Sequence, residues 1–337
     1  MTDRSAILSF LNFEKYWQSF GIFSIIFYPF SLVYQSLAWA RRLCFQFHIF
    51  KTHKFDIPII VIGNITAGGT GKTPLVIWLA NYCLNQGLRV GIVARGYKGK
   101  AHNWPQQVRP DSDPISVGDE AILLASRTKC PVCVSPNRVE AVNALIKHHE
   151  CDLIISDDGM QHYFMERDFE IAVIDGVRRF GNRQFIPAGP LREPLSRLNE
   201  VDLLVVNGES KFKELTYKQL EVEVISLCGR YIKKLSDFKG RQVIAIAGVG
   251  NPRTFFDTLL KNNLIVEEHA FPDHHSFKND DLSFHNKAPI LMTEKDAVKC
   301  KRFFKDKEAW VVVQNIQPDD NFIHRINTFL EKHINIE

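Results

Sequence analysis

The residues with the clearest chemical signature form a glycine-rich loop that follows an apolar run and precedes a helical pattern. The apolar run is Ile57–Ile62, and the loop after it ends in Lys72 and Thr73. Backbone amides of such a loop and the start of the next helix can surround phosphate oxygens, while the lysine reaches the β- and γ-phosphates and the threonine holds Mg²⁺. The predicted phosphate-binding residues are Thr66, Ala67, Gly68, Gly69, Thr70, Gly71, Lys72 and Thr73.

Two positions in the loop narrow the class of phosphate-binding protein. Thr66 stands where the motif G-x-x-x-x-G-K-[ST] has its first glycine, although later glycines still make the loop flexible. Partition-type ATPases carry an extra lysine at the position of Ala67. The guanine-reading motif N/T-K-x-D is also missing, because Thr293–Asp296 has its lysine one place too late. The sequence therefore favours neither a partition ATPase nor a GTPase.

A second apolar run, typical of a buried strand, is followed by a pair of carboxylates. Cys151–Ser156 is mostly apolar and is followed by Asp157 and Asp158. In phosphate-loop proteins an aspartate at such a place holds Mg²⁺, and ligands of open α/β sheets bind beyond the carboxyl ends of the strands. A pair of this kind is often a solvated strand end, but the phosphate loop upstream favours a metal site. The predicted Mg²⁺ ligands are Thr73, Asp157 and Asp158, and which aspartate touches the metal is left open.

The elements that must position these residues alternate between strand and helix patterns from Asp56 onward. Several short runs are apolar on both faces, as buried parallel strands are. This alternation predicts an α/β fold, a P-loop NTPase-like doubly wound and mostly parallel sheet. The predicted strands are Ile57–Ile62, Arg89–Ala94, Pro131–Val134, Asp152–Ser156, Glu170–Ile174 and Val201–Val206, and the predicted helices are Pro74–Asn85, Asp119–Ser126 and Arg138–His149.

The excess positive charge lies in the first 54 residues. The formal net charge is +4, and residues 1–54 alone hold six basic and two acidic residues, so the rest of the chain is neutral. A nucleic-acid-binding protein more often carries its basic patch on the folded body, so nucleic acid is not expected as a partner. Hydrophobic residues make up 45% of the chain, which excludes a disordered protein.

An uncharged stretch, Gln18–Ala40, precedes Arg41 and Arg42. It is long enough to span a membrane, which takes about 20 apolar residues, and it lacks a small-residue cleavage site, so we expect it to be retained. Four polar residues fall on one stripe of a helix: Ser24, Tyr28, Ser31 and Gln35. The segment is therefore either a single span or an amphipathic helix in the interface, and this choice is left open. A buried core helix is the weaker alternative, because the many aromatic residues and the abutting arginines favour a membrane interface. If it spans, the positive charge after it places the body in the cytoplasm.

The patterns divide the chain into three parts. Residues 1–54 form an N-terminal membrane-associated helical segment, residues 55–216 a phosphate-loop core domain, and residues 217–337 a smaller C-terminal α/β domain. The predicted elements of the last part are the strands Glu221–Leu227, Arg241–Ala247 and Trp310–Asn315 and the helix Arg253–Leu260.

The motifs, taken in order, resemble the tetraacyldisaccharide 4′-kinase family, the lipid A 4′-kinases of Gram-negative bacteria. The match includes the apolar N-terminal segment and runs along most of the chain. Met160 stands where the family more usually has phenylalanine, an apolar change of similar volume. The matching segments are Val61–Pro74, Arg95–Tyr97, Val117–Glu120, Asp157–His162, Pro187–Pro194, Phe271–His274 and Thr293–Asp296.

This resemblance implies a lipid kinase that uses ATP and Mg²⁺. Such an enzyme transfers the γ-phosphate to the 4′-hydroxyl of a tetraacylated glucosamine disaccharide 1-phosphate and gives the 1,4′-bisphosphate lipid A precursor. The glycolipid substrate lies in the membrane, so the resemblance implies a protein of the inner membrane with its catalytic body on the cytoplasmic face. No obligate protein partner is expected.

The resemblance also assigns roles to residues that the patterns leave open. Asp119 is implied as the base that takes the hydroxyl proton, although the residue pattern alone favours a helix cap. His274 would orient Asp119 or raise its basicity, and Lys72 would act on the donor phosphates. The residues implied to contact substrate are Arg95, Gln161, His162 and Glu193, for which a structural role stays open.

A phosphate-loop ATPase that acts as a membrane-associated assembly switch is the alternative function. It predicts ATP turnover without a glycolipid and a nucleotide-dependent dimer. Ala67 and the uncharged N-terminal segment argue against it.

Overall fold

The chain folds into two compact units, which we describe separately. The computed structural model describes residues 16–210, 212–273, 275–284, 287–304 and 309–334. Unit 1 comprises residues 1–72, 158–216 and 319–337, and unit 2 comprises residues 73–157 and 217–318. Both units combine parallel strands with helices, which confirms the α/β class. The predicted division into three parts at residues 54 and 216 stays a prediction.

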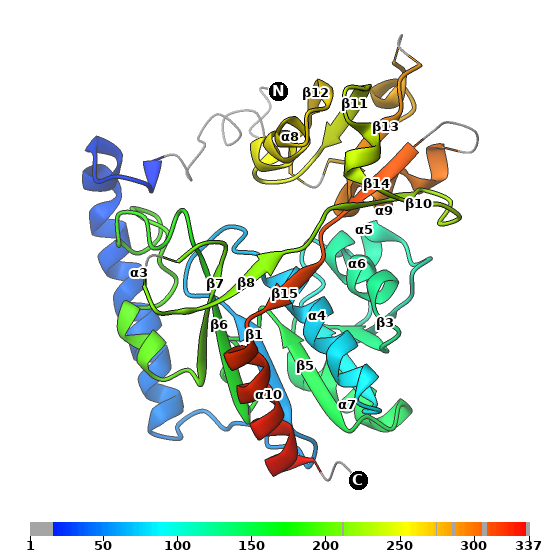
Figure 1. The fold of residues 1–337 in the computed structure, drawn as a ribbon. Coiled ribbons are helices and arrows are strands. Elements are labelled where there is room, and N and C mark those ends of the chain that lie inside the picture. Colours follow the sequence, from blue (N-terminus) through cyan, green and yellow to red (C-terminus); the bar gives the residue numbers. More distant parts are fainter. Residues whose placement is uncertain (1–15, 211, 274, 285–286, 305–308, 335–337) are drawn as a thin grey trace. The chain divides into compact units, whose positions relative to one another are not determined.

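Unit 1 centres on three parallel strands, with β6 between β1 and β7. Every residue of β1 is buried, so the strand reads as a continuous apolar run. Figure 1 shows α10 in red beside these strands, and it packs on β6 through the rings of Phe329 and Phe169, whose centroids are 4.7 Å apart. The elements of unit 1 are α3 (Ile22–Gln46), β1 (Ile59–Gly63), β6 (Phe169–Asp175), η1 (Leu195–Asn199), β7 (Leu203–Asn207) and α10 (Asp320–His333).

The N-terminal helix α3 packs on unit 1 along one side and exposes the other. Ser31 is buried, donates a hydrogen bond to the Phe185 carbonyl (2.8 Å) and accepts one from the Ala188 amide (2.9 Å). Ser24, also buried, accepts a hydrogen bond from the Asn182 side chain (2.9 Å). By length and composition α3 could cross a membrane, and 11% of its most apolar window is buried. Its exposed apolar residues include Ile22, Ile25, Ile26, Phe30, Val33, Leu37 and Trp39.

The polar stripe predicted on this helix is half correct. Both serines face the protein, whereas Tyr28 and Gln35 are exposed. The contact side continues instead through Tyr34, whose hydroxyl donates a hydrogen bond to the Arg192 carbonyl (3.2 Å). The helix therefore turns its polar contacts toward unit 1 and its apolar residues outward.

Arg41 and Arg42, which the sequence suggested for a membrane surface, make contacts within unit 1. Arg41 donates a hydrogen bond to the Gln161 carbonyl (3.1 Å), and its guanidinium lies 5.7 Å from the centroid of the Tyr163 ring. Arg42 forms an ion pair with Glu200. Part of the positive charge after the apolar stretch is thus directed at the protein body.

Unit 2 contains a four-stranded set and a separate six-stranded sheet. In the first set β2 pairs in parallel with β5 and β4, and the short β3 runs antiparallel to β4. β8 and β15 form a short antiparallel pair. The elements of this part are α4 (Lys72–Asn85), β2 (Val90–Ala94), β3 (Gln106–Val108), α5 (Pro114–Val117), α6 (Asp119–Arg127), β4 (Val132–Val134), α7 (Arg138–His148), β5 (Leu153–Asp157), β8 (Leu215–Gln219) and β15 (Ile316–Pro318).

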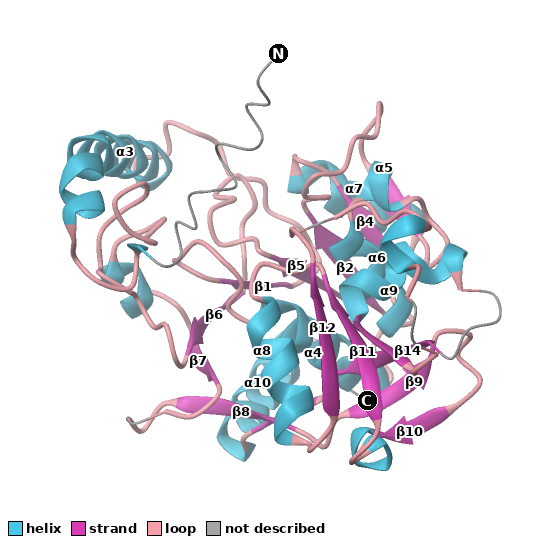
Figure 2. Ribbon diagram, turned by 90° about the horizontal axis from the view of Figure 1, so that it is seen from above, coloured by secondary structure: helices cyan, strands magenta, loops and turns pink. Residues whose placement is uncertain are grey.

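The six-stranded sheet has the order β10-β9-β14-β13-β11-β12, with β12, β11, β13 and β14 parallel. Val243 and Ala245 of β11 face a core that includes residues of α8, while Ile244 faces a core that includes Ala297 of α9. Figure 2 shows α8 and α9 on opposite sides of this sheet. Its elements are β9 (Glu223–Ser226), β10 (Ile232–Lys234), η2 (Leu235–Phe238), β11 (Gln242–Ala247), α8 (Pro252–Lys261), β12 (Ile265–Ala270), η3 (Asp280–Leu282), β13 (Ile290–Thr293), α9 (Glu294–Cys300), η4 (Lys301–Phe303) and β14 (Ala309–Val313).

The predicted elements are confirmed. Each predicted strand and helix of residues 55–216 matches an observed one, with ends that differ by no more than 2 residues. The predicted strands and helix of the C-terminal part correspond to β9, β11, β14 and α8.

Candidate active site

The phosphate loop joins β1 to α4 and requires glycine at two places. Gly68 and Gly71 have φ angles of 97° and 86°, in the left-handed region where a side chain is strained. Thr66, at the place of the motif's first glycine, forms an antiparallel bridge with Leu191. Its backbone does not have a positive φ. The backbone conformation therefore does not require glycine at this position.

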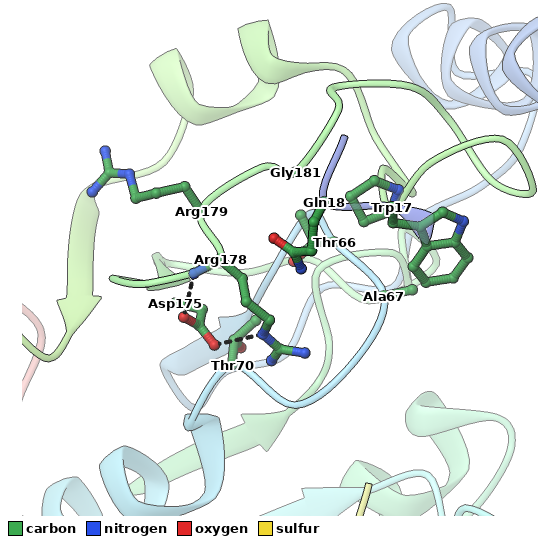
Figure 3. Close-up of a pocket in the computed structure, with 10 residues that line it drawn as sticks. Trp17, Gln18, Thr66, Ala67, Thr70, Asp175, Arg178, Arg179 and Gly181 are labelled. Atoms are coloured by element: carbon green, nitrogen blue, oxygen red, sulfur yellow. Dashed lines mark hydrogen bonds and ion pairs between the residues drawn. The ribbon is translucent and has the colours of Figure 1, made fainter. Parts of the chain in front are cut away.

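Side chains at the ends of two strands hold carbonyl groups of the loop. Asn207, the last residue of β7, donates a hydrogen bond to the Thr70 carbonyl (3.2 Å). Arg178, just after β6, donates to the Gly69 carbonyl and pairs with Asp175 (Nε to Oδ2, 2.8 Å). Figure 3 shows Arg178 beside Thr70 in a small pocket on this side of the loop. Carbonyls fixed in this way leave a loop oriented to offer its amides to phosphate.

Lys72 lies at the end of the loop between two oxygen acceptors. Its Nζ is 3.1 Å from Asn64 Oδ1 and 3.3 Å from Asp158 Oδ1. The second oxygen of Asp158 lies 3.2 Å from Arg192 Nη1. Burial raises the pKa of Asp158, but Lys72 and Arg192 outweigh it and lower the pKa from 3.8 to about 2. Asp158 is therefore ionised throughout the neutral range, between two cations.

A buried network connects Gln161 and Glu193 to this cluster. The Gln161 amide donates hydrogen bonds to the Asn64 carbonyl (2.9 Å) and to Glu193 Oε1 (2.7 Å). The Tyr163 hydroxyl donates to Glu193 Oε2 (2.6 Å), which also lies 3.3 Å from Arg197 Nε. Burial, and then the Glu193 carboxylate, raises the pKa of Tyr163. Gln161 and Glu193 thus brace Asn64, and the substrate contacts expected of them stay predictions.

The other two expected substrate contacts have different surroundings. In unit 1 the ring of His162 is partly buried, 6.0 Å from the Phe164 ring, and its carbonyl accepts a hydrogen bond from Arg167 (2.9 Å). In unit 2 Arg95 is exposed directly after the carboxyl end of β2. An exposed guanidinium at a strand end is available to a ligand phosphate.

Thr73 and Asp157 offer oxygen atoms of the kind that Mg²⁺ prefers. Asp157 ends β5, is 5% exposed, and its carbonyl lies 3.5 Å from Arg138 Nη2. Thr73 is the second residue of α4. In the part of the chain that the structure describes, no group of three or more His, Cys, Asp or Glu side chains could hold a metal ion. Mg²⁺ is usually bound by one or two carboxylates together with substrate phosphates, so the side-chain oxygens of Thr73, Asp157 and Asp158 are of the kind that it takes, and their assignment as its ligands stays a prediction.

Asp119 begins α6, but it is not the cap. Gly118 holds the N-cap position with φ 89°, and a Cβ there would lie 2.7 Å from the Tyr97 carbonyl. The helix-cap interpretation of Asp119 is therefore wrong, because this close approach reserves the cap for glycine. Asp119 is buried, and its carboxylate accepts a hydrogen bond from the Glu120 amide (2.9 Å).

Basic side chains of α9 face the start of α6. Lys299 Nζ lies 3.9 Å from Asp119 Oδ2, and Lys295 forms an ion pair with Glu120. Burial lowers the pKa of Lys295, but Glu120, Asp119 and Asp273 together hold it above its ordinary value. His274 lies outside the described residues, whereas the preceding Asp273 acts on the same lysine as Asp119.

Several residues of these clusters were not predicted from the sequence, among them Asn64, Asn207, Arg178 and Lys299. Asn64 and Asn207 stand at or just after the carboxyl ends of strands, where polar residues signal a site in open α/β sheets. Arg178 and Lys299 carry no such signal, because their importance arises from what they contact.

Comparison with known proteins gives a consistent result. The family model described as tetraacyldisaccharide-1-P 4′-kinase matches residues 23–331. The tetraacyldisaccharide 4′-kinase of Nitrosococcus oceani is 45% identical over 342 residues, covering 100% of this chain and 99% of its own. That of Methylobacillus flagellatus is 43% identical over 328 residues, covering 95% of this chain and 97% of its own.

A solved structure supports the fold. LpxK from Aquifex aeolicus, in complex with ATP, matches with a TM-score of 0.79 at 24% identity, over 92% of this chain and 99% of its own. The matches in sequence cover the whole chain, including α3, the phosphate loop and the segment around Asp119. The chain therefore belongs to the tetraacyldisaccharide-1-P 4′-kinase family.

Proposed function

We propose that Lys72, Thr73, Asp157 and Asp158 handle the phosphate donor and that Asp119 takes the proton of the acceptor. The chain is an ATP-dependent kinase of lipid A biosynthesis that phosphorylates the 4′-position of a tetraacyldisaccharide 1-phosphate. The bond between the γ-phosphorus and the bridging oxygen of ATP breaks, a bond to the 4′-oxygen forms, and the hydroxyl proton passes to Asp119. The observation that carries the proposal is Lys72, held between Asn64 and Asp158 at the end of a glycine-rich loop.

On the donor side, catalysis of phosphoryl transfer is mostly positioning and neutralisation of charge. Lys72 brings its ammonium to the loop residues Thr66–Thr73, whose amides are suited to cradle the donor phosphates. Mg²⁺, held by Thr73 and one or both of Asp157 and Asp158, would neutralise charge on the phosphate oxygens. Because Lys72 and Arg192 flank Asp158, this corner has positive charge to offer to a phosphate.

On the acceptor side, Asp119 is the base in this proposal. A carboxylate in the first turn of a helix is favoured in its ionised form by the helix N-terminus. His274 orients Asp119 or raises its basicity. Arg95, Gln161, His162 and Glu193 contact or position the glycolipid, with exposed Arg95 suited to a phosphate group.

We place the enzyme on the cytoplasmic face of the inner membrane, with α3 lying in the interface. The buried serines of α3 contact unit 1, and its other side is apolar and exposed, as expected for an interfacial helix. No obligate protein partner enters the proposal. Val33→Asp should raise the apparent KM for glycolipid and reduce sedimentation with vesicles, while Gln35→Asp, at an exposed position one turn after the buried Ser31, serves as a charge control.

A mixed-micelle assay with γ-labelled ATP, Mg²⁺ and the tetraacyl disaccharide 1-phosphate tests the kinase reaction. Wild type should label the glycolipid, and Lys72→Ala should lower the rate by about 10²–10³-fold because it removes a preorganised charge at the transferred phosphate. Lys147→Ala, at an exposed lysine of α7, should leave the rate unchanged. Label released as free phosphate regardless of glycolipid would support the assembly-switch ATPase instead.

A further inference from the structure

A chain of alternating charges runs from the start of α6 into α9. Lys299 Nζ lies 2.9 Å from Asp296 Oδ1 and 3.9 Å from Asp119 Oδ2. The three side chains are almost completely buried, with exposed fractions of 9% for Lys299, 6% for Asp119 and 0% for Asp296. One cation thus stands between two carboxylates in a site with little solvent to screen it.

Asp296 is fixed in place by its own hydrogen bonds. One of its oxygens accepts the Gly248 amide (2.8 Å) and the Thr293 hydroxyl (2.6 Å). A Cβ on Gly248 would lie 2.9 Å from the other oxygen, so glycine is what allows the backbone to come this close. The position of the Asp296 carboxylate is therefore fixed, and Lys299 pairs with it at that position.

Lys299 is in turn confined by its surroundings. Its ammonium lies 5.3 Å from the centroid of the Phe277 ring, on which a buried cation is stabilised. A buried ammonium is costly unless opposite charges compensate it. Asp296 supplies one of these charges, and Asp119 is the second carboxylate within 4 Å of the ammonium.

Besides Lys299, the described charged groups near Asp119 include residues of α6, of α9 and of the segment after β12. From α9, Lys295 faces Asp119 and pairs with Glu120 of α6. From the segment after β12, Asp273 acts on the same Lys295. Lys295 is thus shared among three carboxylates, which leaves Lys299 as the cation that Asp119 shares with a single fixed partner.

We propose that Lys299 is a positioning residue that keeps the Asp119 carboxylate ionised and oriented for accepting the hydroxyl proton. This inference rests on the proposed role of Asp119 as the base. Burial alone favours the neutral form of a carboxyl group, which could not accept a proton. The nearby ammonium opposes that effect, and Asp296 sets its strength because it competes for the same ammonium. Lys299 itself does not touch the reacting atoms.

The competition predicts pH shifts of opposite sign in two variants of the full-length enzyme. The measurement is kcat/KM for the glycolipid at saturating ATP across pH 5–9, whose acid limb reports the base of the free enzyme. Lys299→Met should move that limb up by about one pH unit, so the rate at the lowest pH falls about tenfold more than at the highest. Asp296→Asn should move it down, because Lys299 then acts on Asp119 alone.

Two further variants separate positioning from folding. Lys299→Met leaves Asp296 buried without its cation, so the double variant Lys299→Met/Asp296→Asn, which removes both charges, should fold and still show the upward shift. Lys299→Arg should restore the wild-type limb. Lys301→Met, at an exposed lysine, is the matched control. Limbs that coincide with wild type in every variant, with a uniformly lower rate, would overturn the inference.

Asp119→Asn distinguishes this inference from the proposed function. Nearly normal activity in Asp119→Asn would remove Asp119 as the base and overturn both. A large loss there, combined with unmoved limbs in the Lys299 variants, would overturn the role of Lys299 alone.

Discussion

The two charged clusters of this protein have opposite arrangements. In unit 1 the carboxylate of Asp158 stands between two cations, Lys72 and Arg192, and is partly exposed. In unit 2 the ammonium of Lys299 stands between two carboxylates, Asp119 and Asp296, and all three are buried. The first arrangement leaves positive charge to offer to a phosphate, and the second leaves negative charge to accept a proton. A kinase that acts on a hydroxyl group needs one of each.

Removing the carboxylate of the negative cluster should have the largest effect. Asp119→Asn keeps the shape of the side chain but cannot accept the proton, so kcat should fall by about 10³-fold, within the usual range for a general base. The KM for ATP should stay within about twofold of wild type, because the donor side is untouched. Steady-state assays in mixed micelles measure both. Asp111→Asn, at an exposed position, is the control, and a nearly normal kcat would contradict the comparison.

In unit 1, the free energy of unfolding should respond most to a change in the buried network around Glu193, which lies beneath the positive cluster. Glu193→Gln removes a charge that faces Tyr163 and Arg197 inside the network beneath Asn64. Breaking a buried pair by changing one partner costs about 3 kcal/mol in free energy of unfolding. Denaturant unfolding measures this loss, with Glu331→Gln at an exposed site of α10 as the control. A loss below about 1 kcal/mol would mean that the network contributes little to stability.

Loss of Arg178, which holds the phosphate loop, should have a smaller effect, seen in the KM for ATP. Arg178→Met removes the guanidinium that binds the Gly69 carbonyl. The KM for ATP should rise about tenfold, since hydrogen bonds to charged groups contribute about 1.5 kcal/mol or more. kcat should change less, because Lys72 keeps its partners. Arg109→Met is the exposed control, and an unchanged KM would show that the loop holds its shape without Arg178.

The smallest expected effect is a pH-dependent contribution of Asp158 to stability. Its folded pKa is about 2 against an ordinary value of 3.8, so the ion pairs stabilise the protein above pH 3.8 and are lost as the pH falls toward 2. After discount for solvent screening of this partly exposed group, the contribution is about 1 kcal/mol. Wild type and Asp158→Asn should therefore differ in unfolding free energy at pH 6 and converge near pH 2. A difference in unfolding free energy that stays constant from pH 6 to pH 2 would disprove that the ion pairs of Asp158 stabilise the protein.

Much of unit 1 and the first part of unit 2 could be predicted because their strands are buried on both faces. β1 and β5 read as continuous apolar runs that end in the phosphate loop and in Asp157, so strand and site were visible together. β12 escaped prediction because its residues are mostly exposed or half-buried and include Glu267 and Glu268. β8 escaped because only one of its five residues is buried, and β15 escaped because three residues are too few to show a pattern.

The candidate site divides in the same way. Lys72, Thr73 and the aspartate pair belong to motifs that are local in sequence, so their spacing revealed them. Their pairing with distant residues was not visible in this way, because Arg192 and Lys299 are separated from Asp158 and Asp119 by 34 and 180 residues and meet them only in the folded chain. Which cation compensates a buried carboxylate is decided by tertiary packing, for which a single sequence holds no direct signal.

The inward direction of Arg41 and Arg42 has a consequence for how ionic strength affects membrane binding. Arg42 is held by Glu200, and Arg41, although exposed, donates to the Gln161 carbonyl, so the outer side of α3 before these arginines offers lipid only uncharged residues. Of the described residues that follow the helix, Lys51 and Lys54 are exposed and remain to attract anionic headgroups, at about 1 kcal/mol each. Binding to vesicles should thus persist in high salt and depend only weakly on the fraction of anionic lipid. Charge reversal at Lys51 and Lys54 should abolish the weak dependence of vesicle binding on anionic lipid. Arg42→Glu should instead weaken the packing of α3 against the rest of unit 1.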